Sequence, residues 1–259
     1  MDKEKDEIKS DNSSGANKSG TIVSAVFLTF IILSIVYCPF SFAADVFTFA
    51  GGEIDGHGQS FSYLGVDVTE HVNKTIAVAG RIIPNYLTYK YYSGNTLIEA
   101  SSPGVFAVGG IKLFWDRSML GIYGGLEFRN TTLDPDDTNN SARGEKTGGL
   151  IQGEFDSWLT SRNNLNIFAS YGGVSDFFYE KGRLKQQVTN LDYKKSYSLF
   201  AGVEQFVGRN VDFHGEGVGL ALELFYIPEK CSIAIRSGYK HDSTFGNGAY
   251  WGLDLYKGF

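Results

Sequence analysis

Apolar and polar residues alternate along most of this chain. In the closing stretch, Trp251, Leu253 and Leu255 share one face, while Asp254 and Tyr256 lie on the other. A period of two is the signature of a β-strand, and strands with one apolar and one polar face are typical of barrels whose outer side contacts lipid. We therefore predict an all-β fold, an antiparallel transmembrane β-barrel of about twelve strands, with about ten as the alternative.

Glycines and polar clusters divide the chain after residue 44 into candidate strands without an interdomain linker. Pro84 predicts that the third strand bends or ends early, because proline donates no hydrogen bond to a neighbouring strand. The eighth segment is the weakest, since it is polar and carries Lys181 and Arg183. The expected strands are Asp45–Ile54, Ser60–Glu70, Lys74–Tyr92, Gly104–Trp115, Met119–Asn130, Glu145–Leu159, Asn163–Gly173, Asp176–Val188, Lys194–Val207, Gly217–Ile227, Cys231–His241 and Gly248–Phe259.

The connections between these strands are expected to be mostly long at one end of the barrel and short at the other. Outer-membrane barrels have longer external loops and short periplasmic turns. The terminal Phe259 resembles the sorting signal of such barrels, although Lys257 places a charge on the apolar face, where it can snorkel to the interface. The expected long connections are 92–103, 131–144, 208–216 and 242–247, and the short ones are 71–73, 116–118, 160–162, 189–191 and 228–230.

An uncharged segment at 21–40 precedes the strands. Ser41 and Ala43 then supply the small residues of a signal-peptide cleavage site. We expect a polar leader and signal peptide at 1–43, cleaved after Ala43, and an outer-membrane barrel at 44–259. An uncleaved anchor is the alternative, since about 20 apolar residues can span a bilayer. The polar residues 1–20 are either a disordered tail or the result of a start codon assigned too far upstream.

Composition narrows the function classes. A formal net charge of −6 without a basic stripe argues against a nucleic-acid partner. A mean hydropathy of −0.14 is too polar for a helical membrane protein, whereas a barrel keeps half of each strand polar. A secreted soluble β-sandwich remains the alternative fold. Cys38 lies in the leader and Cys231 is then alone, so no disulfide framework is expected.

Charged residues recur on the polar face of the expected strands. Barrels of about eight strands fill their interior with side chains, whereas sixteen-stranded porins leave water, so about twelve strands fall between these cases. The charges either form a plugging ion-pair network or line a narrow passage, for which Tyr123 and Tyr256 on the inner side would suit a carbohydrate. The candidate lumen-facing residues are Glu127, Arg129, Glu154, Glu204, Glu223, Arg236 and Asp254, together with Lys240.

Two groups of residues could carry chemistry, the histidines near the barrel rim and the carboxylates of the loop 134–140. A hydrolase at the barrel rim requires a histidine beside a nucleophile or an acid; Ser237 is too far along its strand from His241, whereas His214 and His241 with Asp212 or Asp242 remain an alternative. The carboxylate-rich loop 134–140 has oxygen ligands for calcium but lacks the EF-hand spacing. The histidines read more simply as solvated loop residues, and the loop as a turn. We therefore assign no catalytic, cofactor or metal site.

Several short motifs resemble the BcsS-type cellulose biosynthesis protein family of bacterial outer-membrane barrels. The matching residues are Gly51-Gly52-Glu53, Leu133-Asp134-Pro135-Asp136-Asp137, and Gly144 through Gly148-Gly149 to Gln152-Gly153-Glu154, whereas Gly208-Arg209-Asn210 departs from the family pattern. The resemblance implies a non-catalytic accessory, located in the outer membrane of a Gram-negative cell, that assists cellulose biosynthesis or secretion. It provides no catalytic or binding residues to transfer.

Expected partners are outer-membrane lipid and, through the resemblance, cellulose or components of the cellulose-synthase complex. No cofactor is expected. Two other functions remain open at this point. One is a small-solute channel or an adhesin barrel, and the other is an outer-membrane hydrolase acting on lipid or peptide.

Overall fold

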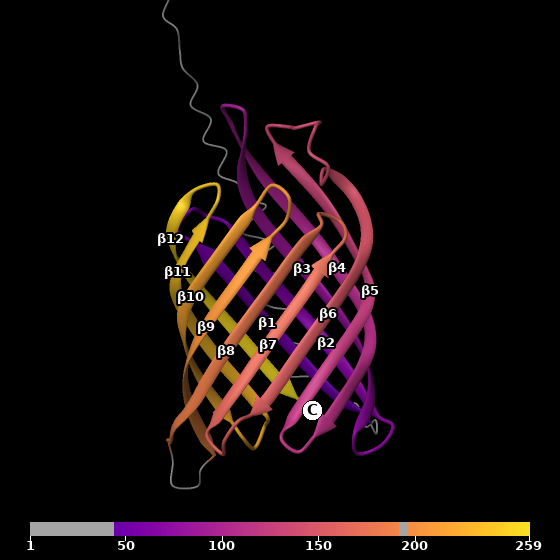
Figure 1. Ribbon diagram of the computed structural model, residues 1–259, viewed down its shortest axis with the longest axis vertical. Coiled ribbons are helices and arrows are strands. Elements are labelled where there is room, and N and C mark those ends of the chain that lie inside the picture. Colours follow the sequence, from indigo (N-terminus) through magenta and orange to yellow (C-terminus); the bar gives the residue numbers. More distant parts are fainter. Residues whose placement is uncertain (1–43, 192–195) are drawn as a thin grey trace, which may run out of the picture. The chain divides into compact units, whose positions relative to one another are not determined.

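The structure is a computed structural model that describes residues 44–191 and 196–259. The strands of this part pair in sequence order, and the last pairs with the first, so they form one closed antiparallel barrel (Figure 1). The predicted transmembrane barrel and its twelve strands are thereby confirmed, and a sandwich of two sheets is excluded. The strands are β1 (Asp45–Asp55), β2 (Ser60–His71), β3 (Ile76–Ser93), β4 (Thr96–Trp115), β5 (Ser118–Asp134), β6 (Gly144–Trp158), β7 (Asn163–Gly172), β8 (Phe177–Asn190), β9 (Tyr197–Arg209), β10 (His214–Tyr226), β11 (Cys231–Asp242) and β12 (Gly246–Gly258).

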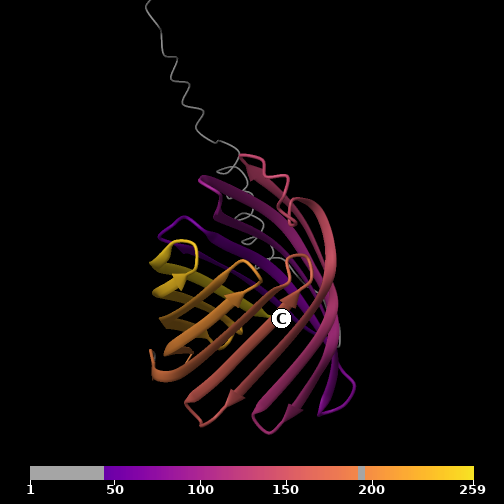
Figure 2. The same cartoon turned by 45° about the horizontal axis from the view of Figure 1, so that its top comes forward.

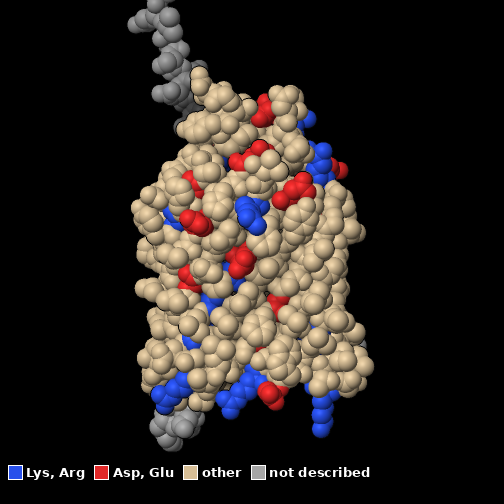
Figure 3. Space-filling view, viewed as in Figure 1, with Lys and Arg blue, Asp and Glu red and all other residues tan. Residues whose placement is uncertain are grey.

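The outer face of the barrel is a broad apolar surface. Val218 and Leu220 in β10 are 65% and 68% exposed, and Ile122, Ile151 and Ile235 on other strands are more than half exposed. Large contiguous apolar surfaces are rare on proteins that face only water, and a lipid environment accounts for this one. In the view of Figure 3, the right flank over β5 and β6 is an uninterrupted stretch of uncharged residues, and basic residues gather at the lower end.

Prolines lie within two long strands rather than ending them. Pro84 is part of β3 and pairs with Val105 of β4, so the expected early end of this strand is wrong. The pairing of β3 with β2 is interrupted opposite Pro84, between Tyr63↔Asn85 and Val66↔Ile82. Proline lacks an N–H group for the ladder, and the pairing is lost only on the side where that hydrogen bond would be needed.

The expected loop at 92–103 is also wrong. Ser93 pairs with Thr96, and the turn between them consists of Gly94, with a φ of 62°, and Asn95. A glycine in the left-handed region closes a two-residue hairpin whose twist matches its strands. β3 and β4 therefore continue to this turn, and β3–β6 rise above the opposite wall of the barrel (Figure 2).

The expected contrast between long and short connections is present in only one loop of the described chain. Residues 135–143, between β5 and β6, form a long connection at the end away from Phe259, whereas the other connections at that end, 56–59, 94–95, 173–176, 210–213 and 243–245, are as short as the turns at the opposite end. The lengths of several strands are greater than predicted, because polar residues near the strand ends still pair with the neighbouring strand. The asymmetry of the barrel resides in the overhang of β3–β6.

The weakest predicted strand is a regular part of the barrel. β8 pairs with β7 along its length and with β9, with one bulge between Gln187 and Thr189. Lys194, the expected start of the next strand, lies outside the described residues. The leader at 1–43, with Cys38 and the cleavage site after Ala43, lies outside them as well, and Cys231 is a free thiol. In the described chain, no helix is long and apolar enough to cross a membrane.

Candidate functional site

The seven predicted lumen residues lie on the inner face of the barrel, and each is paired there with an oppositely charged group. Arg236 and Glu204 are nearly inaccessible to water, with side chains 3% and 0% exposed. Charges this deeply buried are retained only when they are paired and hydrogen-bonded. Glu204, Arg236 and Asp254 belong to one cluster and Glu154 to a second. Two separate ion pairs contain the others: Glu127 with Arg129, and Glu223 with Lys185.

A central cluster occupies the lumen near the middle of the strands. The Arg236 guanidinium donates hydrogen bonds from Nη1 to Glu53 at 3.0 Å and to Glu204 at 3.1 Å, and its Nε lies 3.0 Å from an Asp254 oxygen. Arg183 Nη2 reaches both Glu204 and Asp254 at 2.8 Å. Because Arg183 is on β8 and Asp254 on β12, these side chains join strands that are not neighbours in the sheet.

The central cluster is balanced in charge. Lys181 Nζ lies 3.4 Å from Glu204 and adds a third cation to Arg183 and Arg236, opposite the three carboxylates of Glu53, Glu204 and Asp254. Two tyrosine hydroxyls complete the arrangement: Tyr250 donates to Glu204 at 2.9 Å, and Tyr63 to Asp254 at 3.2 Å. Full pairing offsets the cost of removing these ions from water.

A second cluster lies closer to the end of the barrel that carries Phe259, which we call the turn end. Arg81 donates to Asp67 at 2.8 Å and to Glu154 at 2.9 Å, and Lys112 donates to Asp67 at 2.8 Å. Tyr123, which is 1% exposed, donates to Glu154 at 2.7 Å. Two cations thus face two carboxylates, in a group that extends from β2 to β6.

The remaining inner-face residues form smaller contacts. Arg129 donates to Glu127 at 2.9 Å and to Asn85 at 3.0 Å. Lys185 donates to Glu223 at 2.7 Å. The two tyrosines considered for a carbohydrate path are packed: Tyr123 is buried in the second cluster, and Tyr256 stacks on Phe47 with the ring centroids 5.8 Å apart.

Lys240, the remaining predicted charge, forms an ion pair with Asp55 near the outer end of the barrel. Sequence reasoning identified about half of the inner charges and missed several of their partners. Most of the missed residues share a signal: they alternate with apolar residues of the outer face, as Arg81 does with Ile82. The missed residues are Glu53, Asp55, Asp67, Arg81, Lys112, Lys181, Arg183 and Lys185.

The histidines do not assemble the rim site considered for a hydrolase. His214 lies 3.7 Å from Glu216, whereas the His241 ring is 2.9 Å from the Asn247 amide oxygen. Asp242 instead accepts the backbone N–H groups of residues 244 and 245. Within the described residues, no histidine ring hydrogen-bonds a serine.

The acidic loop at 135–143 is held by an arginine. Arg143 makes a bidentate pair with Asp136, at 2.6 and 2.7 Å, and these hydrogen bonds hold the pKa of the Asp136 carboxyl below its ordinary value. Asp137 accepts the N–H of Asn139. Over the described part of the chain, no group of three or more metal-ligating side chains is placed to hold an ion.

The charge near the C-terminus is also paired. Lys257 donates to Glu229, in the β10–β11 turn, at 2.6 Å, and this bond lowers the pKa of the Glu229 carboxyl. The Lys257 ammonium lies 5.6 Å from the centre of the Phe259 ring. These two contacts stabilise the charge of Lys257 on the outer face, at the edge of the apolar surface.

Comparison with known structures shows the fold. An outer membrane channel from Pseudomonas putida is 12% identical, with 86% of this chain and 98% of that one covered and a TM-score of 0.52. The translocator domain of the autotransporter NalP from Neisseria meningitidis is also 12% identical, over 95% of this chain and 99% of that one, with a TM-score of 0.47. At these identities the likeness concerns architecture alone.

Comparison of sequences shows the family. No curated protein matches the chain. The family model described as cellulose biosynthesis protein BcsS matches residues 42–259, which include every strand of the barrel. The chain therefore belongs to the BcsS family of cellulose biosynthesis proteins.

Proposed function

We propose that this protein is a non-catalytic outer-membrane barrel that assists cellulose production from its surfaces, with a lumen closed to the polymer. Family membership supports the link to cellulose. The exposed apolar outer face supports outer-membrane lipid as its surroundings. The mature protein would begin after Ala43, and cellulose or components of its synthase complex would be its partners.

The central cluster carries the proposal that the lumen is closed. Its ion pairs connect β8 to β12 and β11 to β1 and β9, so they bridge the inner face over six consecutive strands, from β8 to β1. The Glu204 side chain has no exposed surface. A glucan chain could pass this level only if several buried ion pairs separated, and each broken pair leaves unpaired charges at a large cost.

Deletion of the gene in a cellulose-producing host tests the biological role. We expect less cellulose at the cell surface and weaker surface adhesion, both restored by the wild-type gene on a plasmid. Dye binding to the polymer and adhesion to a solid surface measure the two effects. Normal cellulose and normal adhesion in the deletion strain would contradict the proposed role.

Conductance of the purified barrel in planar bilayers separates a closed accessory from a small-solute channel. Because the ion pairs of the central cluster would close the lumen, we expect little ionic current, and the Glu204→Ala variant should conduct more than the wild type. Asp136→Asn, a change in an exposed loop pair, serves as the matched control and should leave the current unchanged. A steady current through the wild type comparable to that of an open porin would favour the channel.

A further inference from the structure

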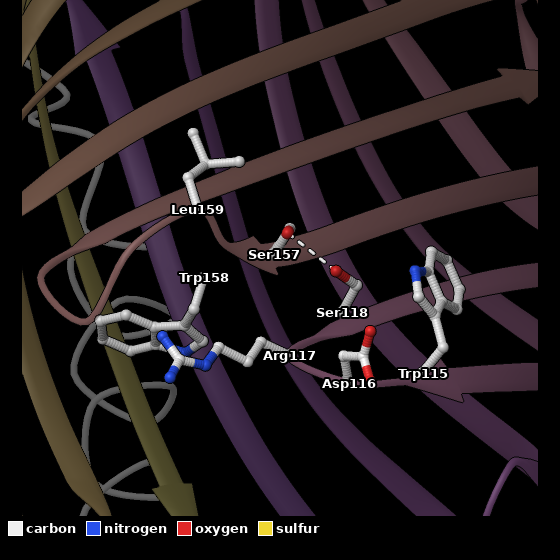
Figure 4. Close-up of a pocket in the computed structure, with 7 residues that line it drawn as sticks. All are labelled: Trp115, Asp116, Arg117, Ser118, Ser157, Trp158 and Leu159. Carbon is white, nitrogen blue, oxygen red and sulfur yellow. Dashed lines mark hydrogen bonds between the residues drawn. The ribbon is translucent and has the colours of Figure 1, made fainter.

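A groove at the turn end of the barrel is separate from the lumen clusters. It lies between the β4–β5 turn and the end of β6, at the end of the barrel that also carries Phe259 (Figures 1 and 4). Its lining includes Trp115, Asp116, Arg117, Ser118, Ser157 and Trp158. Two of the three tryptophans of the chain therefore border one groove.

Both tryptophans are held in place and remain partly exposed beside the groove. Trp115 stacks on Phe155 with the ring centroids 6.2 Å apart, and Trp158 meets the edge of Phe200 at 6.0 Å. Their residues remain 45% and 38% exposed. The neighbouring backbone is fixed as well, because the N–H of Trp158 donates to the Arg117 carbonyl oxygen at 3.0 Å. Rings positioned in this way bind a ligand at little entropic cost.

The polar lining is uncharged as a whole. Asp116 and Arg117 are adjacent and of opposite charge, and both are exposed. The hydroxyls of Ser118 and Ser157 share a hydrogen bond of 2.8 Å. Donors and acceptors without net charge, beside exposed aromatic rings, suit a neutral ligand with one apolar face and many hydroxyl groups.

We propose that this groove binds a segment of a neutral β-linked glucan chain at the periplasmic face of the barrel. Successive sugar rings of the segment would lay their C–H faces on the two indoles and direct their hydroxyls to Asp116, Arg117 and the serines. This inference rests on the proposed function, since the family connects the protein to cellulose. Such a groove would hold the polymer beside the barrel, as expected if the lumen is closed.

The position of the two indoles favours this ligand over a lipid headgroup. Trp115 continues the outward-facing row of Ile111, as an aromatic at a membrane interface would. Trp158 instead follows the inner-facing Gln152 and Glu154 of β6, and it contacts the inner-face residue Phe200. The groove thus extends from the lipid edge towards the mouth of the barrel. A lipid anchor would not require the second tryptophan.

Titration of the full-length mature barrel with cellohexaose tests the proposal. The protein is held in a zwitterionic detergent without a sugar headgroup, and binding is followed by calorimetry and tryptophan fluorescence. We expect binding by the wild type and a loss of affinity of about tenfold in Trp158→Ala, the order expected when one aromatic contact is removed. Trp251→Ala is the matched control: Trp251 is 64% exposed on the outer face of β12 and should be dispensable.

A second variant keeps the test valid if Trp158→Ala does not fold, as judged by heat-modifiable gel migration. Arg117 is exposed in a turn, and Arg117→Ala should also weaken cellohexaose binding. Vesicles containing phosphatidylglycerol provide the competing ligand. Absence of cellohexaose binding, equal binding by the wild type and both groove variants, or groove-dependent binding of the vesicles alone would each overturn the proposal.

The outcomes also separate this inference from the proposed function. If deletion of the gene lowers cellulose but cellohexaose does not bind, only the groove proposal fails. If cellohexaose binds at the groove but the deletion strain makes and displays normal cellulose, only the proposed function fails.

Discussion

Replacing Glu204 by alanine is expected to lower the free energy of unfolding of the barrel by about 3–5 kcal/mol, the usual cost of removing one partner from a buried ion-pair network. Glu204 is contacted by Lys181, Arg183 and Arg236, and it also accepts the Tyr250 hydroxyl. Its loss leaves three cations facing only two carboxylates among largely buried side chains. Urea-dependent unfolding from lipid vesicles, followed by heat-modifiable gel migration, measures the change.

Two further variants divide this effect into its causes. Glu204→Gln keeps the size of the side chain and an acceptor for Tyr250 but removes the charge, so we expect most of the loss to remain. Asp136→Asn breaks an exposed pair with Arg143 and should change stability little, because solvent screens such pairs. A Glu204→Ala variant as stable as Asp136→Asn would mean that water reaches the central cluster. The proposal of a closed lumen would then be wrong.

Much of the fold follows from the alternation of residues, because that pattern is a local property of each strand. In β10, Val218, Leu220 and Leu222 point outward whatever their partners are, and this is legible in the sequence. The count of about twelve strands follows from the number of such alternating segments. The register is not legible, since it depends on which residues meet across the sheet and on turns such as Gly94-Asn95.

The predicted ends of β3 and β4 were wrong for a specific physical reason. Pro84 is predicted to bend or end its strand and Pro103 falls in an expected connection, yet each lies in a long strand that stays fully paired on its other side. The pairing of β4 with β5 skips Pro103, just as that of β3 with β2 skips Pro84. The sequence pattern around each proline does not predict this, because continued pairing depends on the neighbouring strand of the hairpin.

The same distinction applies to the lumen. A charge on the polar face of a strand is predictable, but its partner is not. Arg183 and Asp254 are far apart in sequence and lie on β8 and β12, and only closure of the barrel brings them to 2.8 Å. The least regular strand in the sequence, β8, supplies three of these partners, since Lys181, Arg183 and Lys185 all face inward. Its charges weakened the strand signal because they serve the interior.

Hydrocarbon around the outer face is the premise that the second large effect tests. Leu220 lies near the middle of β10 on the outer face and is 68% exposed. Leu220→Arg should destabilise the barrel by about 2–4 kcal/mol in vesicles, because an arginine at the bilayer midplane loses its hydration.

Glu216 provides the matched control for this substitution. It lies on the same face of the same strand, at the outer end, where its side chain is 60% exposed and already charged. Near the interface the cost of a charge falls to about 0–1 kcal/mol, so Glu216→Arg should fold almost as well as the wild type. Equal stability of the two variants in vesicles would show that the middle of β10 is not in contact with lipid. A steep difference between them requires that depth in a membrane, rather than the chemistry of the substitution, sets the cost.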